Sequence, residues 1–347
     1  MTDLRVGLLG VGMMGADHAK RLAYRTSGAH LVAVSDPATD RAQRLAAGID
    51  GVSFLPDAAE LVASDEVDAV VIASPGFAHE EQVLACLEHG KPVLCEKPLT
   101  MDATSSYRLV EAEARGGRSL VQVGFMRRFD PEYAALKALL DSGDHGRTLL
   151  LHHVHRNKSV AGDFRSEMIV RDSLVHEVDV SRWLFGAEIE EVTILAPTPT
   201  SAVEDGVLDP QLAVFRMAGG AIATAEVFVN SQIGYEVRCE AVGEHGTATV
   251  GRGQGLVIRR DNRLGEAIPD DFRTRFARAY DLEVQAWVDA TRRGEVVGPT
   301  TWDGYAASAV CEAGLESLAS GRPARVTLGE RPPGKTHHPQ HRHRPEG

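Results

Sequence analysis

A carboxylate and an imidazole lie four residues apart in the segment RDSLVHEVD, which spans residues 171–179. If the segment is helical, Asp172, His176 and Asp179 share one face. Histidine can accept and return a proton at neutral pH because its ordinary pKa is about 6.5, and a carboxylate one turn away can orient the ring. The same spacing is also typical of a solvated stripe on an exposed helix. The segment alone therefore leaves acid–base chemistry and a bland helix face open.

A second reactive pair, Glu96 and Lys97, stands in CEKPLT directly after a short apolar strand predicted at residues 92–95. Charged groups at the end of a buried strand need a partner or a chemical role. A lysine near a substrate hydroxyl can donate a hydrogen bond and stabilise negative charge that develops on its oxygen. The alternative is a Glu–Lys pair on the surface.

The N-terminal stretch GLLGVGMMG predicts a phosphate-binding loop between a strand at residues 5–9 and a helix at residues 15–25. Its first glycine makes a tight turn, its second admits a pyrophosphate close to the backbone, and its third permits close helix–strand packing. Because the pattern stands between a strand and a helix, it predicts a dinucleotide site. The loop residues assigned to the cofactor are Gly10, Gly12, Met13, Met14 and Gly15.

Asp36 ends the next predicted strand, at the distance from the glycines where a dinucleotide site places an acidic residue. Its carboxylate would accept hydrogen bonds from ribose hydroxyls and repel a 2′-phosphate, which favours NAD over NADP. A turn or helix-capping residue is the alternative. Ser74, Pro75 and His79 follow a further strand and, with Glu96 and Lys97, would lie at the same edge of the sheet beside the cofactor.

These residues need elements that bring them together. Regular alternation of strands and helices over residues 1–125 predicts an α/β Rossmann domain with a doubly wound parallel sheet. Residues 126–328 predict an α+β domain with a large, mostly antiparallel sheet, because their strands alternate polar and apolar residues. In one of these strands, alternation places His153, His155 and Asn157 on one face, where they could bind several hydroxyls or simply face solvent.

Composition restricts the possible partners. The 347 residues include 37 basic and 49 acidic residues, and the net charge is −12. Outside the extreme C-terminus the chain lacks the basic stripe that nucleic acid requires, so we expect no nucleic acid partner. No apolar run approaches the roughly 18 residues of a membrane span, and no signal-peptide pattern stands at the N-terminus. We therefore expect a cytoplasmic protein with no membrane contact.

Cysteine and histidine usage predicts no metal site. The four cysteines are far apart in the sequence, which favours reduced thiols over a zinc site or a disulfide framework. Residues 329–347 form a tail rich in Pro, His and Arg that we predict to be disordered. Its histidines could ligate a metal, but nothing fixes them, so a solvated tail is favoured; they are His337, His338, His341 and His343.

Together these motifs resemble the Gfo/Idh/MocA oxidoreductase family. The resemblance covers about residues 5–325, and FMRRFD, HRN and DSLVHE look closest to the inositol 2-dehydrogenase branch. One departure is Gly76, where many relatives carry Asn. The motifs are GxGxxG at residue 10, S-P…H at 74–79, EKP at 96–98, VGFMRRFD at 123–130, HRN at 155–157 and DSLVHEVDVSRWLFG from 172.

The resemblance implies a site as well as a fold. It implies that His176 is the acid–base residue, that Asp172 is its relay partner, and that Lys97 holds the reacting hydroxyl. It also implies a set of polyol-binding residues, namely Arg127, His155, Asn157, Asp179 and Tyr235.

The expected activity is NAD-dependent oxidation of a secondary hydroxyl of a cyclic polyol, foremost myo-inositol to 2-keto-myo-inositol (scyllo-inosose). The alternatives are the same chemistry on scyllo-inositol, an aminocyclitol or a sugar, an NAD-dependent glycoside hydrolase, and a non-catalytic NAD-binding regulator. The resemblance further implies a homo-oligomer, a dimer or tetramer formed through the open face of the C-terminal sheet.

Overall fold

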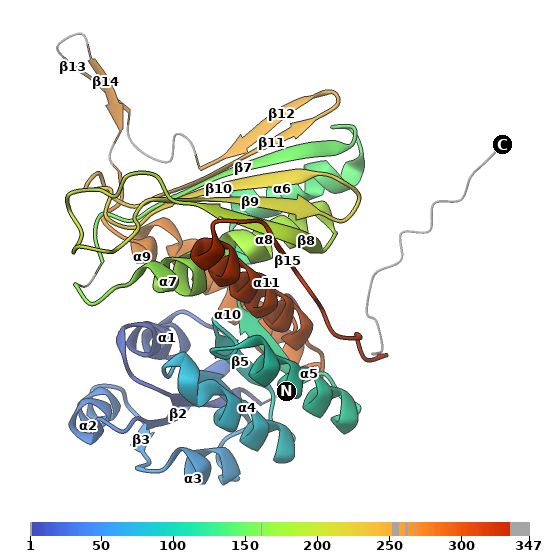
Figure 1. The fold of residues 1–347 in the computed structure, drawn as a ribbon. Coiled ribbons are helices and arrows are strands. Elements are labelled where there is room, and N and C mark those ends of the chain that lie inside the picture. Colours follow the sequence, from blue (N-terminus) through green and yellow to red (C-terminus); the bar gives the residue numbers. More distant parts are fainter. Residues whose placement is uncertain (1, 161, 252–256, 261–262, 267, 334–347) are drawn as a thin grey trace.

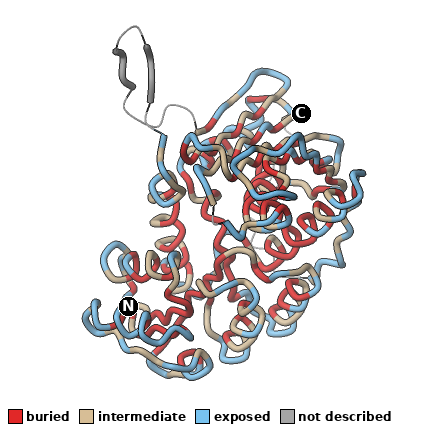
Figure 2. The backbone as a smooth tube through the Cα atoms, turned by 60° about the vertical axis from the view of Figure 1, so that its left-hand side comes forward, coloured by how far each residue is buried: buried red, intermediate tan, exposed pale blue. Residues whose placement is uncertain are grey.

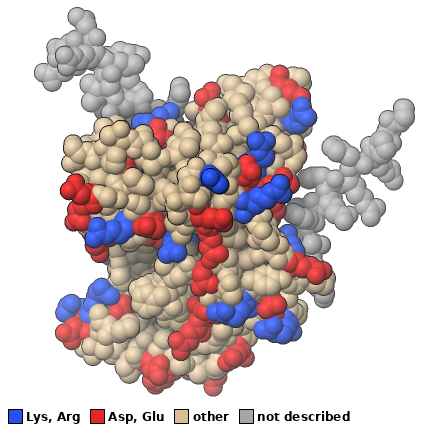
Figure 3. Space-filling model, viewed as in Figure 1, with Lys and Arg blue, Asp and Glu red and all other residues tan. Residues whose placement is uncertain are grey.

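The computed structural model describes residues 2–160, 162–251, 257–260, 263–266 and 268–333, and its chain forms two units, each built on one large sheet (Figure 1). Figure 2 shows that the buried backbone is concentrated in the two sheets and in the helices between them. Acidic and basic side chains are interspersed on the face drawn in Figure 3. Among the described residues, no helix combines the length and the apolar character that a membrane crossing requires.

The first unit is a six-stranded parallel sheet in the order β3-β2-β1-β4-β5-β6, which confirms the predicted doubly wound Rossmann sheet. Its central strand β4 is buried at all four positions, because helices cover both faces of such a sheet. The strands are β1 (Leu4–Leu9), β2 (Ala29–Ser35), β3 (Ser53–Phe54), β4 (Ala69–Ile72), β5 (Val93–Glu96) and β6 (Val121–Gly124). The helices are α1 (Met13–Tyr24), α2 (Thr39–Ala47), α3 (Ala58–Ala63), α4 (His79–Glu88) and α5 (Ala103–Gly116), with the short turn η1 (Gly76–Ala78).

The second unit is a seven-stranded sheet in the order β12-β11-β7-β10-β9-β8-β15. All neighbouring strands run antiparallel except β7 and β10, which confirms a mostly antiparallel sheet. The strands are β7 (Thr148–Arg156), β8 (Ile189–Leu195), β9 (Gln211–Met217), β10 (Ile222–Phe228), β11 (Glu236–Gly243), β12 (Gly246–Val250) and β15 (Ala324–Arg325). A separate hairpin, β13 (Val257–Arg260) with β14 (Arg263–Glu266), projects from the unit (Figure 1).

Helices cover one face of this second sheet, chiefly α8 (Val175–Phe185) and α11 (Thr301–Ser320) (Figure 1).

The strand β7 shows the predicted alternation, since His153 and His155 are buried toward the helices while His152 is exposed on the other face. The remaining helical segments are η2 (Met126–Phe129), α6 (Pro131–Ser142), α7 (Ser166–Met168), η3 (Ile169–Leu174), α9 (Phe272–Arg275) and α10 (Ala277–Thr291).

Helix α10 packs against the first sheet although it follows the second sheet in sequence. Its buried Trp287 and Val288 belong to the same apolar cluster as Val6 and Leu8 of β1. The chain therefore returns to the first unit after the second sheet, and Ala279 and Tyr280 of the same helix belong to the apolar cluster that contains residues of both sheets.

The segment RDSLVHEVD, residues 171–179, is helical, but its start differs from a regular α-helix. Residues Ile169–Leu174 form a π-helix, and the regular α-helix starts only at Val175. A π turn bonds residue i to i+5, so the side chain that stacks below a given residue moves from i+4 toward i+5. This change of period alters which side chains of the DSLVHE segment face one another.

The segment predicted as a disordered tail is packed at its start. The Gly329 amide donates to the Tyr305 hydroxyl at 2.6 Å, and the Tyr107 hydroxyl donates to the Glu330 carbonyl at 2.7 Å. Aromatic side chains at the start of α11 and in α5 provide this docking surface, so ordered structure extends past the expected boundary at residue 328. The tail histidines and the rest of the predicted tail, 334–347, lie outside the described residues.

Candidate active site

The glycine loop between β1 and α1 has the backbone that a dinucleotide requires. Gly10 adopts φ 86°, and a Cβ there would lie 2.5 Å from the Ser74 amide nitrogen at the end of β4. A Cβ on Gly15 would overlap the Gly10 carbonyl oxygen, so helix and strand pack at closest approach. A Cβ on Gly12 would meet nothing within 4 Å, which leaves open space at the N-terminus of α1. Met13 and Met14 form the first turn of that helix, and Met13 is exposed.

Asp36 lies at the end of β2 and accepts hydrogen bonds from the amides of Val11 and Ala38, each at 2.7 Å. Arg41 donates to both carboxylate oxygens, at 3.0 and 3.1 Å. Burial acts to raise the pKa of Asp36, but these hydrogen bonds and the Arg41 charge outweigh it and lower the pKa. Asp36 is thus a fixed anion that ties β2 to the glycine loop.

The loops after β4 and β5 are joined through His79. Its two ring nitrogens lie 2.8 Å from the carbonyl oxygens of Ser74 and Pro98, so this histidine braces the edge of the sheet. The Ser74 hydroxyl donates to Gln82, and Pro75 is exposed beside it. A Cβ on Gly76 would lie 2.8 Å from the sulfur of Met101, so these neighbours occupy the space that a larger residue would need.

Glu96 at the end of β5 is bound by a residue that the sequence analysis did not single out. Its Oε1 lies 2.7 Å from Nε2 of the buried His18 in α1, and its Oε2 accepts a hydrogen bond from the Lys97 amide at 3.3 Å. The carboxylate therefore links α1 to the EKP loop and fixes the backbone that carries Lys97.

Lys97 joins the two units. Its ammonium donates to the carbonyl oxygen of Asp172 at 2.8 Å, which brings the EKP loop against the π-helix. Burial lowers the pKa of Lys97, although the nearby Asp172 and Glu96 oppose that change. Burial also raises the pKa of Asp172, and Lys97 opposes it. The two side chains influence each other through their opposite charges, but the hydrogen bond of Lys97 is to the backbone of Asp172.

His176 lies in the first turn of α8 and is 7% exposed. Its ring centroid lies 6.3 Å from those of Phe125 and His155. Burial, together with the positive charges of Lys97 and Arg127, lowers the pKa of His176 well below its ordinary value. Burial and these charges therefore favour the neutral form of the ring, whose unprotonated nitrogen has a lone pair.

The expected contact between Asp172 and the ring of His176 is not formed. Within the described residues the Asp172 carboxylate makes no hydrogen bond, and Nδ1 of His176 is buried without a partner. The π-helical turn between them accounts for this, because it displaces the i, i+4 alignment on which the prediction depended.

A buried chain of polar groups lies beside His176. Arg127 donates to Glu177, and Glu177 bonds Nδ1 of His155 at 3.1 Å. The ring of Tyr235 lies 5.8 Å from that of His155 and is also buried. Asn157 follows on the same strand face, and its buried Oδ1 has no partner among the described residues. Three of the five predicted polyol-binding residues, Arg127, His155 and Tyr235, are thus brought together, and Asn157 stands two residues after His155.

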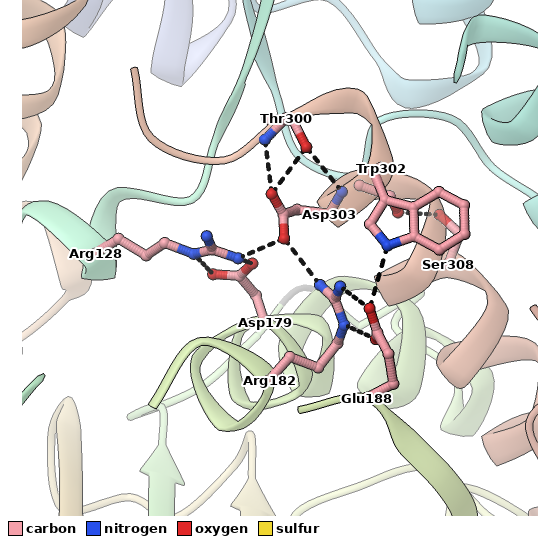
Figure 4. Close-up of polar contacts among 9 residues, drawn as sticks. Arg128, Asp179, Arg182, Glu188, Thr300, Trp302, Asp303 and Ser308 are labelled. Carbon is pink, nitrogen blue, oxygen red and sulfur yellow. Dashed lines mark hydrogen bonds and ion pairs between the residues drawn. The ribbon is translucent and has the colours of Figure 1, made fainter. Parts of the chain in front are cut away.

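The fifth, Asp179, is not brought to this group. Its two oxygens accept hydrogen bonds from Arg128 at 3.0 and 2.5 Å, inside an ion network on another side of α8 (Figure 4). Asp179 is three residues after His176 and about 300° further round an α-helix, so a small rotation of the helix sends the two side chains to different neighbours.

Three polar residues with buried partners were missed in the sequence analysis: Glu177, Arg128 and His18. Each is buried or nearly so and paired with an opposite charge or an imidazole partner. A signal for the first two was present, because adjacent arginines after a predicted buried strand require acidic partners. His18 carried no such signal, since its partner is 78 residues away.

Comparisons with known proteins agree with this geometry. A model of the oxidoreductase family with an NAD-binding Rossmann fold matches residues 4–125, and a model of the GFO/IDH/MocA C-terminal domain matches residues 133–249. The chain belongs to the Gfo/Idh/MocA oxidoreductase family. This confirms the resemblance read from the motifs.

Members of the family with assigned names resemble the chain over nearly all its length. It is 52% identical to an inositol 2-dehydrogenase of Mycolicibacterium gilvum (strain PYR-GCK), covering 95% of each chain. It is 52% identical to inositol 2-dehydrogenase 4 of Saccharopolyspora erythraea, covering 95% of this chain and 98% of that one. A crystal structure of myo-inositol dehydrogenase from Lactobacillus casei in complex with NAD(H) and myo-inositol superposes with a TM-score of 0.92, at 34% identity over 95% and 99% of the two chains.

The position of Asp36 predicts a change in cofactor preference. We expect Asp36→Ser to lower the ratio of kcat/KM with NAD to kcat/KM with NADP by about 10- to 100-fold, because charge-assisted hydrogen bonds contribute about 1.5–3 kcal/mol. Loss of the Asp36 carboxylate also leaves Arg41 able to bind the 2′-phosphate of NADP. Steady-state kinetics with both cofactors measures the ratio. Asp40→Ser, a change in the adjoining helix, is the control, and an unchanged ratio in Asp36→Ser would refute the assignment.

The Glu177 carboxylate predicts a pH-dependent contribution to stability. Burial acts to raise its pKa, but Arg127 and His155 outweigh burial and lower the pKa to about 2. A lowered folded-state pKa means that the stabilisation is complete above the unfolded value of about 4.3 and is lost as the pH falls toward 2. We expect Glu177→Gln to lower the free energy of unfolding by about 3–5 kcal/mol at pH 7, with a smaller difference at pH 3.

Urea unfolding of both proteins at pH 7, 5 and 3 measures this difference. Glu66→Gln is the matched control, because Glu66 pairs with Arg5 but its side chain is 83% exposed, and we expect a change of at most about 1 kcal/mol. A Glu177→Gln difference that is equal at all three pH values would contradict the ion-pair explanation.

Proposed function

We propose that this chain oxidises a secondary hydroxyl of a cyclic polyol with NAD, most specifically myo-inositol to 2-keto-myo-inositol (scyllo-inosose). The observation that carries the proposal is the hydrogen bond from Lys97, at the carboxyl edge of the Rossmann sheet, to the Asp172 carbonyl, one helical turn before the buried His176. The names of the similar proteins support the choice of substrate. The first unit holds the cofactor, and the second supplies the substrate contacts.

In this proposal His176 acts as the general base and takes the proton of the reacting hydroxyl. Lys97 donates a hydrogen bond to the same oxygen and stabilises the negative charge that develops as the proton leaves. NAD, when bound, accepts the hydride from the carbon that carries this hydroxyl. The residues of the cofactor edge fit such a group, because Gly12 leaves space at the helix N-terminus and Asp36 presents a fixed carboxylate. Asp172 acts through its charge beside Lys97 and through its carbonyl oxygen.

The remaining hydroxyls of the ring would be held by the buried polar group beside His176. The Oδ1 of Asn157, which has no partner among the described residues, can accept a hydrogen bond from a hydroxyl, and the hydroxyl of Tyr235 and the ring of His155 offer further partners. Arg127 keeps a buried Nε without a partner among the described residues, and this donor is available to a hydroxyl oxygen. The buried partners of these groups fix their directions, which is how such a site distinguishes stereoisomers.

A panel of polyols tests the activity. We expect reduced nicotinamide to form with myo-inositol and NAD, and we expect His176→Ala to lower kcat by about 10²- to 10⁴-fold and Lys97→Met by about 10²- to 10³-fold. The absorbance of reduced nicotinamide measures the rates. Arg108→Met, which removes an exposed arginine paired with Glu80, is the control and should keep full activity.

The panel also separates the rival activities. Faster turnover of scyllo-inositol, an aminocyclitol or an aldose would assign the same chemistry to another substrate. Cleavage of an aryl glycoside without net reduced nicotinamide would indicate a glycoside hydrolase, and tight NAD binding without any turnover would indicate a regulator. Unchanged kcat in both variants, with substrate still bound, would remove the assignment of the catalytic residues.

We also propose that the chain is a cytoplasmic homo-oligomer, a dimer or tetramer formed through the open face of the second sheet. That face presents half-buried apolar side chains, among them Leu150, Val154 and Ile222, on neighbouring strands, and in the part of the chain that the structure describes the helices lie on the other face (Figure 1). Such a face is typical of an interface. The four cysteines are buried free thiols, in keeping with a reducing compartment; they are Cys86, Cys95, Cys239 and Cys311.

Light scattering tests the assembly. We expect a mass of two or four chains for the unmodified protein and a smaller mass for Leu150→Asp, because its cross-strand neighbours Ile222 and Val242 are apolar and would leave the charge unpaired in the interface. Tyr24→Asp, at a position that is 68% exposed on α1, should keep the full mass. A monomeric unmodified protein at micromolar concentration would exclude this interface.

A further inference from the structure

The turn after β6 contacts three residues at the start of α8. The ring of Phe125 lies 6.3 Å from that of His176, Arg127 is paired with Glu177, and Arg128 is paired with Asp179. His176 therefore lies on a helical turn whose neighbouring acidic residues are both bound by adjacent arginines. This arrangement links the position of the proposed base to the end of the cofactor sheet.

Arg128 extends the contact to α11 (Figure 4). Its Nη2 donates to Asp303 at 3.0 Å while also bonding Asp179. Asp303 accepts a second hydrogen bond from Arg182 at 3.2 Å, and its other oxygen accepts from the amide and hydroxyl of Thr300 at 2.8 and 2.9 Å. Asp303 is thus held by two guanidinium groups and by the N-cap of α11.

Glu188 and Arg182, at the far side of the network, also have hydrogen-bond partners. Glu188 accepts from Arg182 at 2.5 and 2.8 Å and from the indole of Trp302 at 3.1 Å. The network contains two arginines and three acids in all. Its central side chains are shielded from solvent, with exposures of 11% for Arg128, 1% for Asp179, 6% for Arg182 and 18% for Asp303. Shielded charge-assisted hydrogen bonds of this kind are strong and directional.

Both anchors of the network are attached to β6, the edge strand of the cofactor sheet. Arg128 lies in η2, the short turn that follows that strand. Thr300 and Asp303 follow Pro299, whose carbonyl accepts a hydrogen bond from the Val123 amide of β6 at 2.8 Å. The contact between Asp179 and this network therefore fixes the position of α8 relative to the cofactor sheet.

Helix α8 needs a contact that fixes its orientation, because of how the helix begins. The π-helix that precedes it has a wider turn than the α-helix, so the rotation of α8 relative to the cofactor edge differs from that of a continuous α-helix. Apolar packing under the helix is non-directional. The hydrogen bonds of Arg128, in contrast, tolerate little rotation or sliding.

We propose that Arg128, Asp179 and Asp303 form a positioning clamp that sets the rotation and height of α8 and so places His176 at the cofactor edge. The proposal rests on the role given to His176 above. None of the three residues need touch the substrate. A displacement of about 1 Å in a reacting group can cost roughly 100-fold in rate, so a loosened clamp reduces the rate of chemistry while NAD binding stays the same.

Three variants test the clamp. Asp303→Asn keeps the shape of the side chain but removes its charge, Arg128→Met removes the bridge, and Arg128→Lys keeps one ion pair but cannot span both acids. Arg5→Met is the matched control, since Arg5 also bridges two acids, Asp68 and Glu66, away from the site. Each variant is measured for kcat, for the primary deuterium isotope effect on kcat, for the Kd of NAD, and for melting temperature.

We expect Asp303→Asn and Arg128→Met to lower kcat by roughly 10- to 100-fold, with a larger isotope effect and an unchanged Kd for NAD. Arg128→Lys should recover part of the loss, and Arg5→Met should behave as the unmodified enzyme. A folded variant whose melting temperature falls while kcat and the isotope effect are unchanged would show a purely structural role and overturn the proposal. If Arg128→Met does not fold, Asp303→Asn carries the same test.

A readout that needs no turnover separates this proposal from the proposed function. The groups that face His176 are Lys97 after β5, Arg127 in η2 and His155 in β7. If α8 moves away from these groups, the pKa of His176 should lie closer to 6.5. NMR of the imidazole nitrogens measures this pKa, and the His176→Gln variant assigns the signal. Failure of the whole polyol panel would refute the proposed function alone. A His176 titration identical in Asp303→Asn and the unmodified protein would refute the clamp.

Discussion

The ion pair between Arg127 and Glu177 is the interaction on which the site depends. Both side chains are fully buried, so neither charge has water to solvate it and each requires the other. Because Arg127 follows the last strand of the cofactor sheet and Glu177 stands in α8, the pair fixes the two units to each other. It also sets the polar surroundings of His176, since Glu177 holds His155 from the other side.

Charge compensation is repeated around this centre. Glu96 joins His18 to the EKP loop, Lys97 joins that loop to the π-helix, and Arg128 joins α8 to α11. Each pair crosses a boundary between elements that are distant in the sequence. The result is a cofactor edge whose reactive groups are held from several directions, as a pre-organised site requires.

The most local features were the most predictable. Gly10, Gly12, Gly15 and Asp36 stand within one βαβ unit, so strand and helix periods place them without knowledge of distant parts. The short strand β3 and the hairpin β13–β14 escaped prediction, because brief segments carry few periods of their pattern. The packing of α10 against the first sheet escaped as well, since an amphipathic helix does not specify which apolar surface it covers.

The sequence by itself determined the two sheets and the cofactor edge with Lys97 on it, because these depend on short-range pattern and on the common edge of parallel strands. The role of His176 beside that edge was implied by the family resemblance and not by its spacing. Only the tertiary structure decided the roles of the acids around His176. The π-helix before α8 moved Asp172 off the ring, and Arg128 drew Asp179 into a separate network while Glu177 took the place beside His155. Those outcomes depend on which distant cation satisfies each buried carboxylate, and residue spacing carries no information about that choice.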